Sequence, residues 1–297
     1  MEYSKVRYES LDDGRIVRIT LSRPAQRNAQ NRSLLVELDH AMLRAEADDQ
    51  VRVVILAGEG RTFSSGHDLG SAEWVAERTP GDPGFHPTFA ENGGTKLRTE
   101  QRMRQEWHYF FQNTLRWRNL RKITIGQVHG QVMSAGLMLM WSCDLIVAAE
   151  DTTFADVVGT RLGMCGLEYF AHPWEFGPRK AKELLLTGDS INAEEAYALG
   201  FVSKVFPTED LADKALDFAR RIASLPSMTS LLIKEGVNQA VDQMGFTNSL
   251  QSAFTIHQLN HAHWGELHDG VPRADPSDGI ADWRDAGPVR PALKDQA

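Results

Sequence analysis

The sequence has little cysteine and no long apolar run. Only two cysteines, Cys143 and Cys165, occur among 297 residues, and they lack CxxC spacing. This composition argues against a disulfide framework and against a cysteine-ligated zinc site. The longest apolar run, Gly136 to Trp141, is far shorter than the roughly 18 residues that a membrane span needs. The segment Met1 to Ser10 contains no apolar signal region. We therefore expect a cytoplasmic protein with no membrane partner.

The chain also has fewer basic than acidic residues. The chain carries 40 acidic and 32 basic residues, for a net charge of −8. This balance argues against a nucleic-acid partner, so local basic residues must bind any phosphate group of a ligand. With 42% hydrophobic residues, the chain can bury one large core and has room for a small appendage.

Hydrophobic patterns along the chain predict an α/β fold. Apolar and polar residues alternate from Val17 to Leu21, which is typical of a half-buried strand. Apolar residues recur at helical spacing from Ser33 to Asp49, with Ser33 as the expected N-cap, and the run Val51 to Ala57 predicts a buried strand. This order is that of a parallel βαβ unit. The pattern recurs in expected strands at residues 123–128, 144–149 and 201–206 and in a helix from about Ala135.

The rest of the chain predicts helices and two irregular segments. A capping box at Asn192 to Glu195 begins a short helix that Gly200 ends, and the pattern from Leu211 onward is helical. A helix between Leu97 and Leu120 carries aromatic residues, which we interpret as core or subunit contacts. The Pro- and Gly-rich segment Thr79 to Thr95 is interpreted as a mobile loop. We expect an α/β core over residues 1–207, a C-terminal helical region over 208–269 and an extended tail over 270–297.

Two clusters of small residues indicate a ligand that approaches the main chain. One cluster spans Ser64 to Gly66 and the other Ser134 to Gly136. Small side chains leave main-chain N–H groups accessible to a ligand. If Ala135 begins a helix, its N–H has no helical partner and the helix dipole favours negative charge there, as on a developing oxyanion. The alternative is that these residues only allow a strand and a helix to pack closely.

Three blocks of sequence combine in a recognisable order and spacing. They are Leu21 to Ala29, Arg61 to Leu69 and Val128 to Asp144, the last followed by residues 186–189 and 198–202. Over roughly residues 10–265 these blocks resemble the enoyl-CoA hydratase/isomerase (crotonase) superfamily. The resemblance implies an α/β spiral of ββα units with a C-terminal helical trimerisation region, assembled as a homotrimer or a dimer of trimers.

The resemblance also implies the ligand and the residues that bind it. The ligand would be an acyl-CoA thioester, in which coenzyme A is part of the substrate, with no separate cofactor. The N–H groups of Ser65 and Ala135 would stabilise the thioester enolate. Residues expected to contact the thioester or coenzyme A are Arg27, Ser65, Gly66, Asp68, Leu69 and Gly136. Lys96 or Arg98 could add a cation beside the loop, whereas Arg27 could equally be a solvated surface charge.

The sequence departs from this family at the catalytic acids. Hydratases of the family hold a water molecule between two glutamates. Here the first position falls on Met138 and the second on Val158 or Gly159. None of these side chains transfers a proton, and general acid–base steps commonly contribute ~10² to 10⁴ in rate. The usual hydration mechanism is therefore not supported by the sequence.

Two other carboxylates are candidates for the missing acid. Glu168 is one residue away from the position at which dienoyl-CoA isomerases and chlorobenzoyl-CoA dehalogenases carry a functional acid, and Asp156 precedes the second vacant position by two or three residues. Either could instead be a structural carboxylate. His67 follows the first small-residue cluster and could serve as a base or as a hydrogen-bonded structural residue.

The remaining polar residues near these motifs are expected to be structural. Asp68, although named above among the contacts, more often caps the next helix in this family than it touches the substrate. His129 is expected to be a hydrogen-bonded structural residue and Asp144 a structural acid. His261 and His263 project from different sides of a helix and have no cysteine or acidic cluster in sequence beside them, with His257 and His268 nearby, so no metal site is predicted.

Two functions remain open from the sequence. The first is a hydratase, isomerase or related lyase of fatty acid metabolism that acts on acyl-CoA with Glu168 or Asp156 as a non-standard acid. The second is a catalytically silent acyl-CoA-binding protein in which Met138 and Val158 fill the water site. A serine hydrolase is disfavoured because the segment around Ser65 lacks the GxSxG motif.

Overall fold

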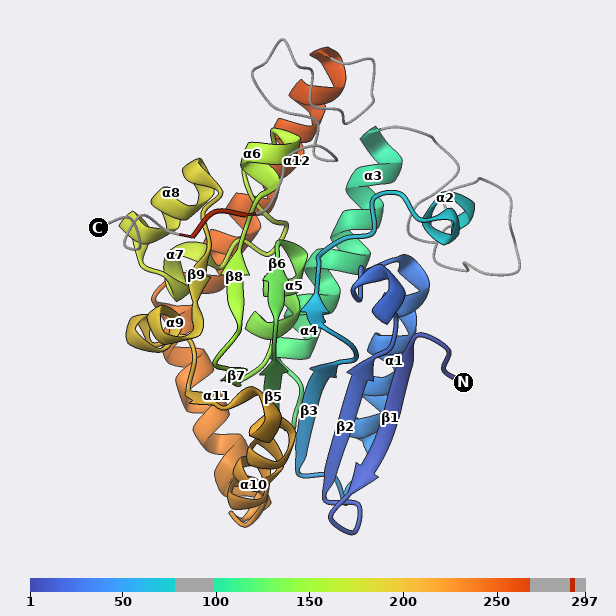
Figure 1. Cartoon of the computed structure of the whole chain (residues 1–297), viewed down its shortest axis with the longest axis vertical. Coiled ribbons are helices and arrows are strands. Elements are labelled where there is room, and N and C mark those ends of the chain that lie inside the picture. The colour runs from blue at the N-terminus through green and yellow to red at the C-terminus, as the bar shows by residue number, and fades with distance from the viewer. Residues whose placement is uncertain (78–98, 268–288, 292–297) are drawn as a thin grey trace.

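The larger of two sheets forms the base of the molecule (Figure 1). The computed structural model describes residues 1–77, 99–267 and 289–291. Within them this sheet has six strands in the order β1-β2-β3-β5-β7-β10. Its neighbouring strands are parallel except for the antiparallel pair β1 and β2. The strands are β1 (Val6–Leu11), β2 (Ile16–Leu21), β3 (Val53–Gly58), β5 (Ile123–Val128), β7 (Leu145–Ala149) and β10 (Lys204–Phe206).

The smaller sheet continues the larger one. It consists of β4 (Thr62–Ser64), β6 (Gln131–Met133), β8 (Thr153–Ala155) and β9 (Ile191–Asn192), in the order β4-β6-β8-β9. The chain passes from β3 to β4, from β5 to β6 and from β7 to β8, and each time then enters a helix. Three successive ββα units therefore place their first strands in one sheet and their second strands in the other. This arrangement confirms the crotonase-like spiral implied by the sequence.

The core has one layer on each face of the larger sheet. Successive residues of β3 point to opposite faces, so that Val54 and Leu56 join the cluster under helix α1 (Arg32–Ala47), whereas Val53 and Ile55 pack with helix α10 (Leu211–Ala223). All four side chains are at most 1% exposed. This two-sided burial explains the nearly continuous apolar run in the sequence. It also makes α10 part of the core packing, although α10 begins within the expected C-terminal helical region.

Helix ends follow local capping chemistry. Asn192 and Glu195 form the predicted capping box of α9 (Ala193–Leu199), and Gly200 adopts the left-handed conformation at the end of that helix. At α1, however, Asn31 is the N-cap and accepts a hydrogen bond from the N–H of Leu34. The expected cap, Ser33, lies inside the helix, where its hydroxyl donates to Glu77.

The predicted aromatic helix between Leu97 and Leu120 contains a change of helical type. It consists of α3 (Thr99–Glu106), a π-helical segment η3 (Trp107–Gln112) and α4 (Asn113–Arg118). Phe111 and Trp117 are buried in the core, which confirms that part of the prediction. Phe110 instead stacks on His67, with ring centroids 3.8 Å apart. Wide π-helical turns of this kind occur frequently at functional sites.

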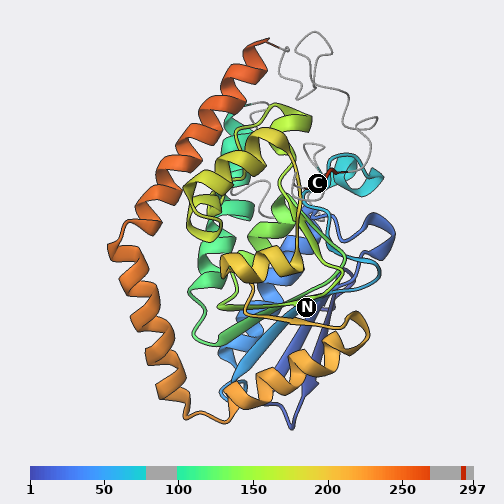
Figure 2. The ribbon, with the colours of Figure 1, turned by 60° about the vertical axis from the view of Figure 1, so that its left-hand side comes forward.

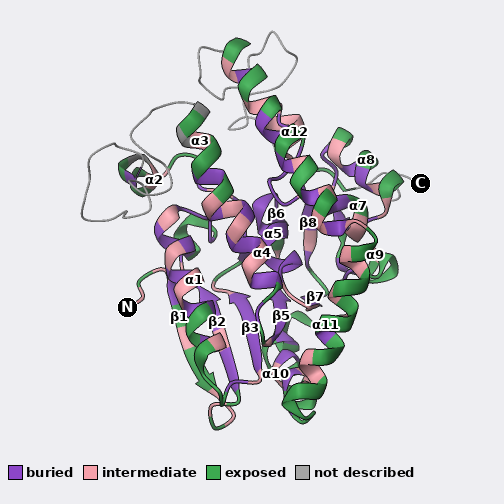
Figure 3. Ribbon diagram, turned by 180° about the vertical axis from the view of Figure 1, so that it is seen from behind, coloured by how far each residue is buried: buried purple, intermediate pink, exposed green. Residues whose placement is uncertain are grey.

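The last two helices run in succession along one side of the molecule (Figure 2). They are α11 (Ser227–Gln243) and α12 (Phe246–Leu267). Much of their surface is exposed (Figure 3), including the apolar side chains Met228, Leu232, Ile233, Val237, Ile256 and Leu259. No helix within the described residues has the length and apolar character needed to cross a membrane. The other helical segments are η1 (Pro24–Gln26), α2 (Ala72–Glu77), α5 (Ala135–Trp141), α6 (Val158–Leu162), α7 (His172–Glu175), α8 (Pro178–Thr187) and η4 (Thr208–Asp210).

The contact between β4 and α5 can be tested with a pair of glycine substitutions. A Cβ atom on Gly136 would lie 2.6 Å from the carbonyl oxygen of Ser64, whereas a Cβ atom on Gly236, within α11, would meet nothing within 4 Å. We expect Gly136→Ala to lower the free energy of unfolding by about 1–3 kcal/mol through overpacking. Gly236→Ala should instead raise it by about 0.5–1 kcal/mol through helix propensity. Urea denaturation would measure both, and wild-type stability of Gly136→Ala would contradict the close contact.

Candidate active site

The two clusters of small residues meet in the structure. Strands β4 and β6 are parallel neighbours, so the turns that follow them lie side by side. A Cβ atom on Gly66 would lie 3.2 Å from the main-chain nitrogen of Ala135 and 3.0 Å from the carbonyl oxygen of Met133. Only glycine therefore allows this approach without a shift of the main chain. The turn after β4 and the N-terminus of α5 form a single main-chain surface.

Ala135 is the first residue of α5, as the sequence predicted. Its N–H has no hydrogen-bond acceptor among the described residues, in keeping with its place at a helix start. The preceding residue, Ser134, has φ 46° and ψ −118°, a conformation that L residues rarely adopt. Such a conformation costs about 1–3 kcal/mol and is found most often at functional sites.

The N–H of Ser65 is already occupied. It donates to the carbonyl oxygen of Arg27 at 3.0 Å, and the N–H of Gly66 faces the hydroxyl of Ser64 at 3.3 Å. The N–H of Ser65, which the sequence led us to expect at a thioester oxygen, is therefore paired within the protein. The next N–H along the turn, that of His67, has no acceptor among the described residues. Which N–H groups of this turn are paired depends on the conformation of the folded loop. The sequence motif does not specify that conformation.

Glu168 lies beside this turn. Its side chain is 4% exposed, and its Oε1 lies 3.8 Å from Nδ1 of His67 and 3.6 Å from Nε2 of His257. Its other oxygen, Oε2, is buried and has no hydrogen-bond partner among the described residues. Buried carboxylate oxygens are seldom left unpaired in folded proteins. Glu168 is therefore a buried acid with one oxygen close to two imidazoles and the other without a partner among the described residues.

His67 is held by packing rather than by strong hydrogen bonds. Its ring stacks on Phe110, and its Nε2 atom is buried without a partner among the described residues. The side chain is 18% exposed. Both of the possibilities that the sequence left open for His67, a base and a structural residue, are compatible with this position.

Asp156 is engaged in a separate buried ion pair. Its Oδ2 lies 2.9 Å from Nε2 of His172, and its Oδ1 accepts from the N–H of Val158 at 3.1 Å. Both side chains of the pair are at most 1% exposed. His172 also packs edge-on against Trp141 of α5. Because both oxygens of Asp156 have partners within the protein, the geometry favours a structural role over an acid for a ligand.

The remaining expected binding residues divide into buried and exposed ones. Asp68 pairs with Arg23 at 3.0 Å and accepts hydrogen bonds from Ser71 and Gly70. Burial alone would raise the pKa of Asp68, but these hydrogen bonds outweigh it and lower the pKa. Arg27 and Leu69 are exposed, and no described carboxylate pairs with Arg27.

Several residues have the structural surroundings that the sequence predicted. His129 contacts the carbonyl oxygen of Gly60 at 2.8 Å, and Asp144 pairs with Lys234 at 3.0 Å.

Met138 is 2% exposed within α5, and Val158 packs against the same core. Gly159 lies in α6. Lys96, Arg98, His268 and the segment Thr79 to Thr95 lie outside the described residues.

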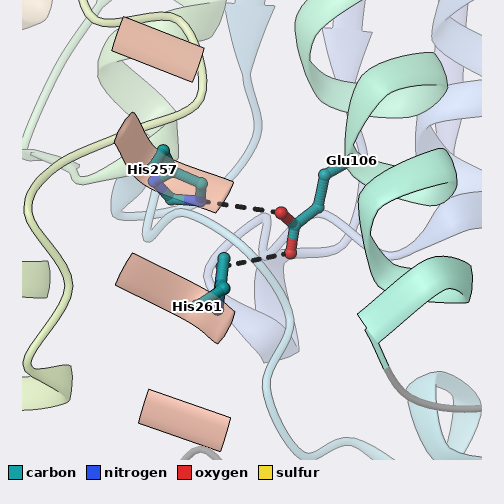
Figure 4. A group of neighbouring side chains, drawn as sticks. All are labelled: Glu106, His257 and His261. Carbon is teal, nitrogen blue, oxygen red and sulfur yellow. Dashed lines mark ion pairs between the residues drawn. The ribbon is translucent and has the colours of Figure 1, made fainter. Parts of the chain in front are cut away.

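Glu106, His257 and His261 form a buried group between α3 and α12 (Figure 4). Glu106 lies 3.6 Å from Nε2 of His257 and 3.2 Å from Nε2 of His261. His263, which lies two residues from His261 in the sequence, is exposed and takes no part in this group. The sequence signal for this group was the spacing of His257 and His261, because residues four apart lie on the same face of a helix. The approach of Glu106 depends on tertiary packing and carries no comparable sequence signal.

The distances among these three side chains would allow them to bind a metal ion. Their neighbours, however, indicate that the histidine nitrogen facing Glu106 carries a hydrogen. Nη1 of Arg102 lies 3.3 Å from Nδ1 of His261. Because an arginine side chain only donates, Nδ1 is the acceptor and Nε2 carries the hydrogen that points to Glu106. A metal ligand nitrogen must be free of hydrogen. We therefore interpret the group as a network of ion pairs and hydrogen bonds.

Comparison with known proteins places the chain in a family. A family model described as "Enoyl-CoA hydratase/isomerase" matches residues 12–82 and 84–266. The "Putative enoyl-CoA hydratase EchA13" of Mycobacterium tuberculosis is 65% identical over 294 residues, covering 99% of this chain and 92% of the relative. The 4-chlorobenzoyl coenzyme A dehalogenase-2 of an Arthrobacter species is 28% identical, covering 84% of this chain and 85% of its own. A crystal structure of a probable enoyl-CoA hydratase from Mycobacterium smegmatis has a TM-score of 0.80 and 38% identity, covering 91% of this chain and 99% of that one.

The ion pair of Asp156 and His172 leads to a prediction that separates stability from chemistry. We expect Asp156→Asn to lower the free energy of unfolding by about 3–5 kcal/mol, because it leaves one partner of a buried ion pair without its counter-charge. The exposed Asp151→Asn is the matched control and should unfold as the wild type does. Thermal unfolding followed by circular dichroism measures both variants. A stable Asp156→Asn protein that binds thioesters but has lost all turnover would instead identify Asp156 as a catalytic acid.

Proposed function

The chain belongs to the enoyl-CoA hydratase/isomerase family, and from this premise we propose that it is an enzyme that acts on an acyl-CoA thioester as a hydratase, isomerase or related lyase. The observation that carries the proposal is the unpartnered, buried Oε2 of Glu168. The other oxygen of this side chain lies 3.8 Å from the ring of His67, which follows Gly66 in the turn that contacts Ala135. An acid and a potential oxyanion site next to each other are the two components that enolate chemistry on a thioester requires.

The oxyanion would be bound by main-chain N–H groups. We assign this role to Ala135 and, in place of Ser65, to His67, because the N–H of Ser65 donates to Arg27. The start of α5 supplies an unsatisfied donor, and the contact of Gly66 with Ala135 brings the turn of His67 close to it. Removal of one such donor typically costs about 2.7–4 kcal/mol of transition-state stabilisation.

Glu168 would transfer the proton. Its burial, its position beside His67 and its free oxygen support this role, whereas both oxygens of Asp156 are engaged. The role does not require an acid at Met138, Val158 or Gly159, which occupy the positions of the two glutamates of typical hydratases. A carboxylate next to the thioester would remove a proton from the carbon beside the carbonyl or return one to the enolate. In an isomerisation, the proton removed from one carbon would return at another as the double bond shifts. In a hydration, the carboxylate would take a proton from water as its oxygen bonds to the β-carbon, and would return that proton to the α-carbon of the enolate.

The relatives support a coenzyme A thioester as the ligand. EchA13 and the M. smegmatis protein are named for enoyl-CoA, and the Arthrobacter dehalogenase is named for 4-chlorobenzoyl coenzyme A. The exposed Arg27, whose carbonyl oxygen holds the turn of Ser65, is a suitable cation for the phosphate groups of coenzyme A.

A catalytically silent acyl-CoA-binding protein is the second candidate. The observation in its favour is that Met138 is buried and apolar where a typical hydratase would position its water with an acid. A binder of this kind would still bind the thioester oxygen through main-chain N–H groups. It would not need the unpartnered oxygen of Glu168, because it would transfer no proton.

The two candidates are separated by turnover of enoyl-CoA thioesters. We expect turnover of crotonyl-CoA or a longer enoyl-CoA, and Glu168→Gln should lower kcat by about 10² to 10⁴ because it removes the acid while keeping its shape. The exposed Glu194→Gln serves as the control and should keep wild-type kcat. Tight binding of the thioesters with no turnover of any of them would favour the silent binder. Undiminished turnover by Glu168→Gln would exclude Glu168 as the acid.

We also propose that the protein assembles as a trimer or a dimer of trimers through its C-terminal helices. The exposed apolar side chains of α11 and α12 support this assembly, since contiguous apolar surface commonly marks a protein interface. Leu232→Glu and Ile233→Glu together should dissociate the assembly, as measured by light scattering after gel filtration. Lys182→Glu, on the exposed surface of α8, is the control. A wild-type protein that is monomeric at micromolar concentration would contradict the proposal.

A further inference from the structure

Glu168 has a neighbour that the proposed reaction has not yet used. Nε2 of His257 lies 3.6 Å from Glu168 and 3.6 Å from Glu106. The other ring nitrogen, Nδ1, lies 2.9 Å from the carbonyl oxygen of Gly166 and donates to it. The ring of His257 is therefore fixed by one hydrogen bond and directed between two carboxylates, each on a different segment of the chain.

A second layer of contacts holds Glu106 in place. Its Oε2 accepts a hydrogen bond from Gln258 at 2.6 Å, and its Oε1 lies 3.2 Å from His261. Arg102 in turn contacts His261. Glu106, His257 and Gln258 are all buried. These contacts hold Glu106 beside Nε2 of His257.

The charges within this region favour a protonated His257. Two carboxylates, Glu106 and Glu168, are buried on either side of it, and buried charges are stable only when they are paired. Cys165 and His261 also face the ring of His257, whereas Arg102 and His67 contact its neighbours rather than its ring. An imidazolium at His257 is thus the positive charge closest to both acids.

The pKa shifts of His257 and Glu106 are consistent with an ion pair between them. Burial would lower the pKa of His257, but a hydrogen bond with Cys165 and the charges of Glu106 and Glu168 outweigh burial and raise the pKa well above 6.5. Burial would likewise raise the pKa of Glu106, yet the hydrogen bonds and charges of His257 and His261 lower it below its ordinary value.

We propose that His257 is a positioning residue for Glu168. Its imidazolium, held by the hydrogen bond from Nδ1 to Gly166, places a positive charge 3.6 Å from Oε1 of Glu168 and leaves Oε2 free for proton transfer. The inference rests on the proposed function of Glu168 as the acid–base group. It adds that activity depends on the protonation of His257, and that the neighbouring carboxylate of Glu106 maintains this protonation.

The first test measures the protonation of His257 and needs no substrate. In the ¹⁵N-histidine-labelled protein, long-range ¹H–¹⁵N spectra should show both ring nitrogens of His257 protonated at pH 7, with the resonance assigned by its loss in His257→Gln. Glu106→Gln keeps the shape of the side chain but removes its charge, so the pKa of His257 should fall by about one unit or more. A neutral His257 at pH 7 in the wild type would overturn the inference and leave the role of Glu168 intact.

The second test measures catalysis in the same variants. With the enoyl-CoA that the wild type turns over, His257→Gln should lower kcat by about tenfold or more while KM stays within about twofold. Glu106→Gln should move the loss of kcat at alkaline pH to a lower pH, because activity is lost as His257 loses its proton. The control is His263→Gln, an exposed position on the same helix, which should behave as the wild type. Melting temperatures of all variants distinguish misfolding from loss of positioning.

The outcomes of the two tests are distinguishable. Wild-type kcat and pH profile in both His257→Gln and Glu106→Gln would overturn the inference even if the spectra show an imidazolium. Stoichiometric zinc in the purified protein, together with loss of the imidazolium signal, would also overturn it and identify a metal site. If no thioester is turned over by the wild type, the proposed function fails and the positioning role fails with it.

Discussion

The close contact between two main-chain turns is the constraint on which the rest of the site depends. Parallel pairing of β4 with β6 directs both turns to the same edge of the smaller sheet. Gly66 and Gly136 then allow the turns to touch, since a Cβ atom at either position would meet main-chain atoms of the other turn. Ser134 takes up the strained conformation that starts α5 at this point. The fold thereby fixes main-chain donors before any ligand arrives, which is how oxyanion sites are commonly preorganised.

The second feature of the site is a chain of buried charges. Glu168, His257, Glu106 and His261 follow one another from the turn of His67 to the space between α3 and α12. Removing such charges from water is costly, so each must be matched by an opposite charge or a hydrogen bond. The alternation of acidic and imidazole side chains meets this requirement. It also leaves Oε2 of Glu168 as a buried oxygen with no partner within the described residues.

The regular core could be predicted from the sequence because it obeys simple periods. The strands at residues 53–58 and 123–128 are buried on both faces, and the capping box at Asn192 has a local signature. The short strands of the smaller sheet, such as β4 with three residues, are too short to show a period. β1 was missed because only Val6 among its residues is buried.

The site was only partly accessible to sequence reasoning. The motif located Ala135 and the turn of Ser65 correctly as a pair, but which N–H remains free depends on the hydrogen bond between Ser65 and Arg27, a property of the folded loop. Glu168 could be named as a candidate, whereas its free oxygen depends on packing. The helical spacing of His257 and His261 was available in the sequence, but their partner Glu106 lies some 150 residues earlier in the chain, on α3.

The most direct measurement of the central claim is a crystal structure of the protein with a non-reactive acyl-CoA thioester analogue. The account predicts that the thioester oxygen lies about 2.7–3.1 Å from the main-chain nitrogens of both His67 and Ala135, with Oε2 of Glu168 directed at the carbon next to the carbonyl. A thioester oxygen bound away from these two N–H groups, or a Glu168 carboxylate turned away from the acyl chain, would contradict it.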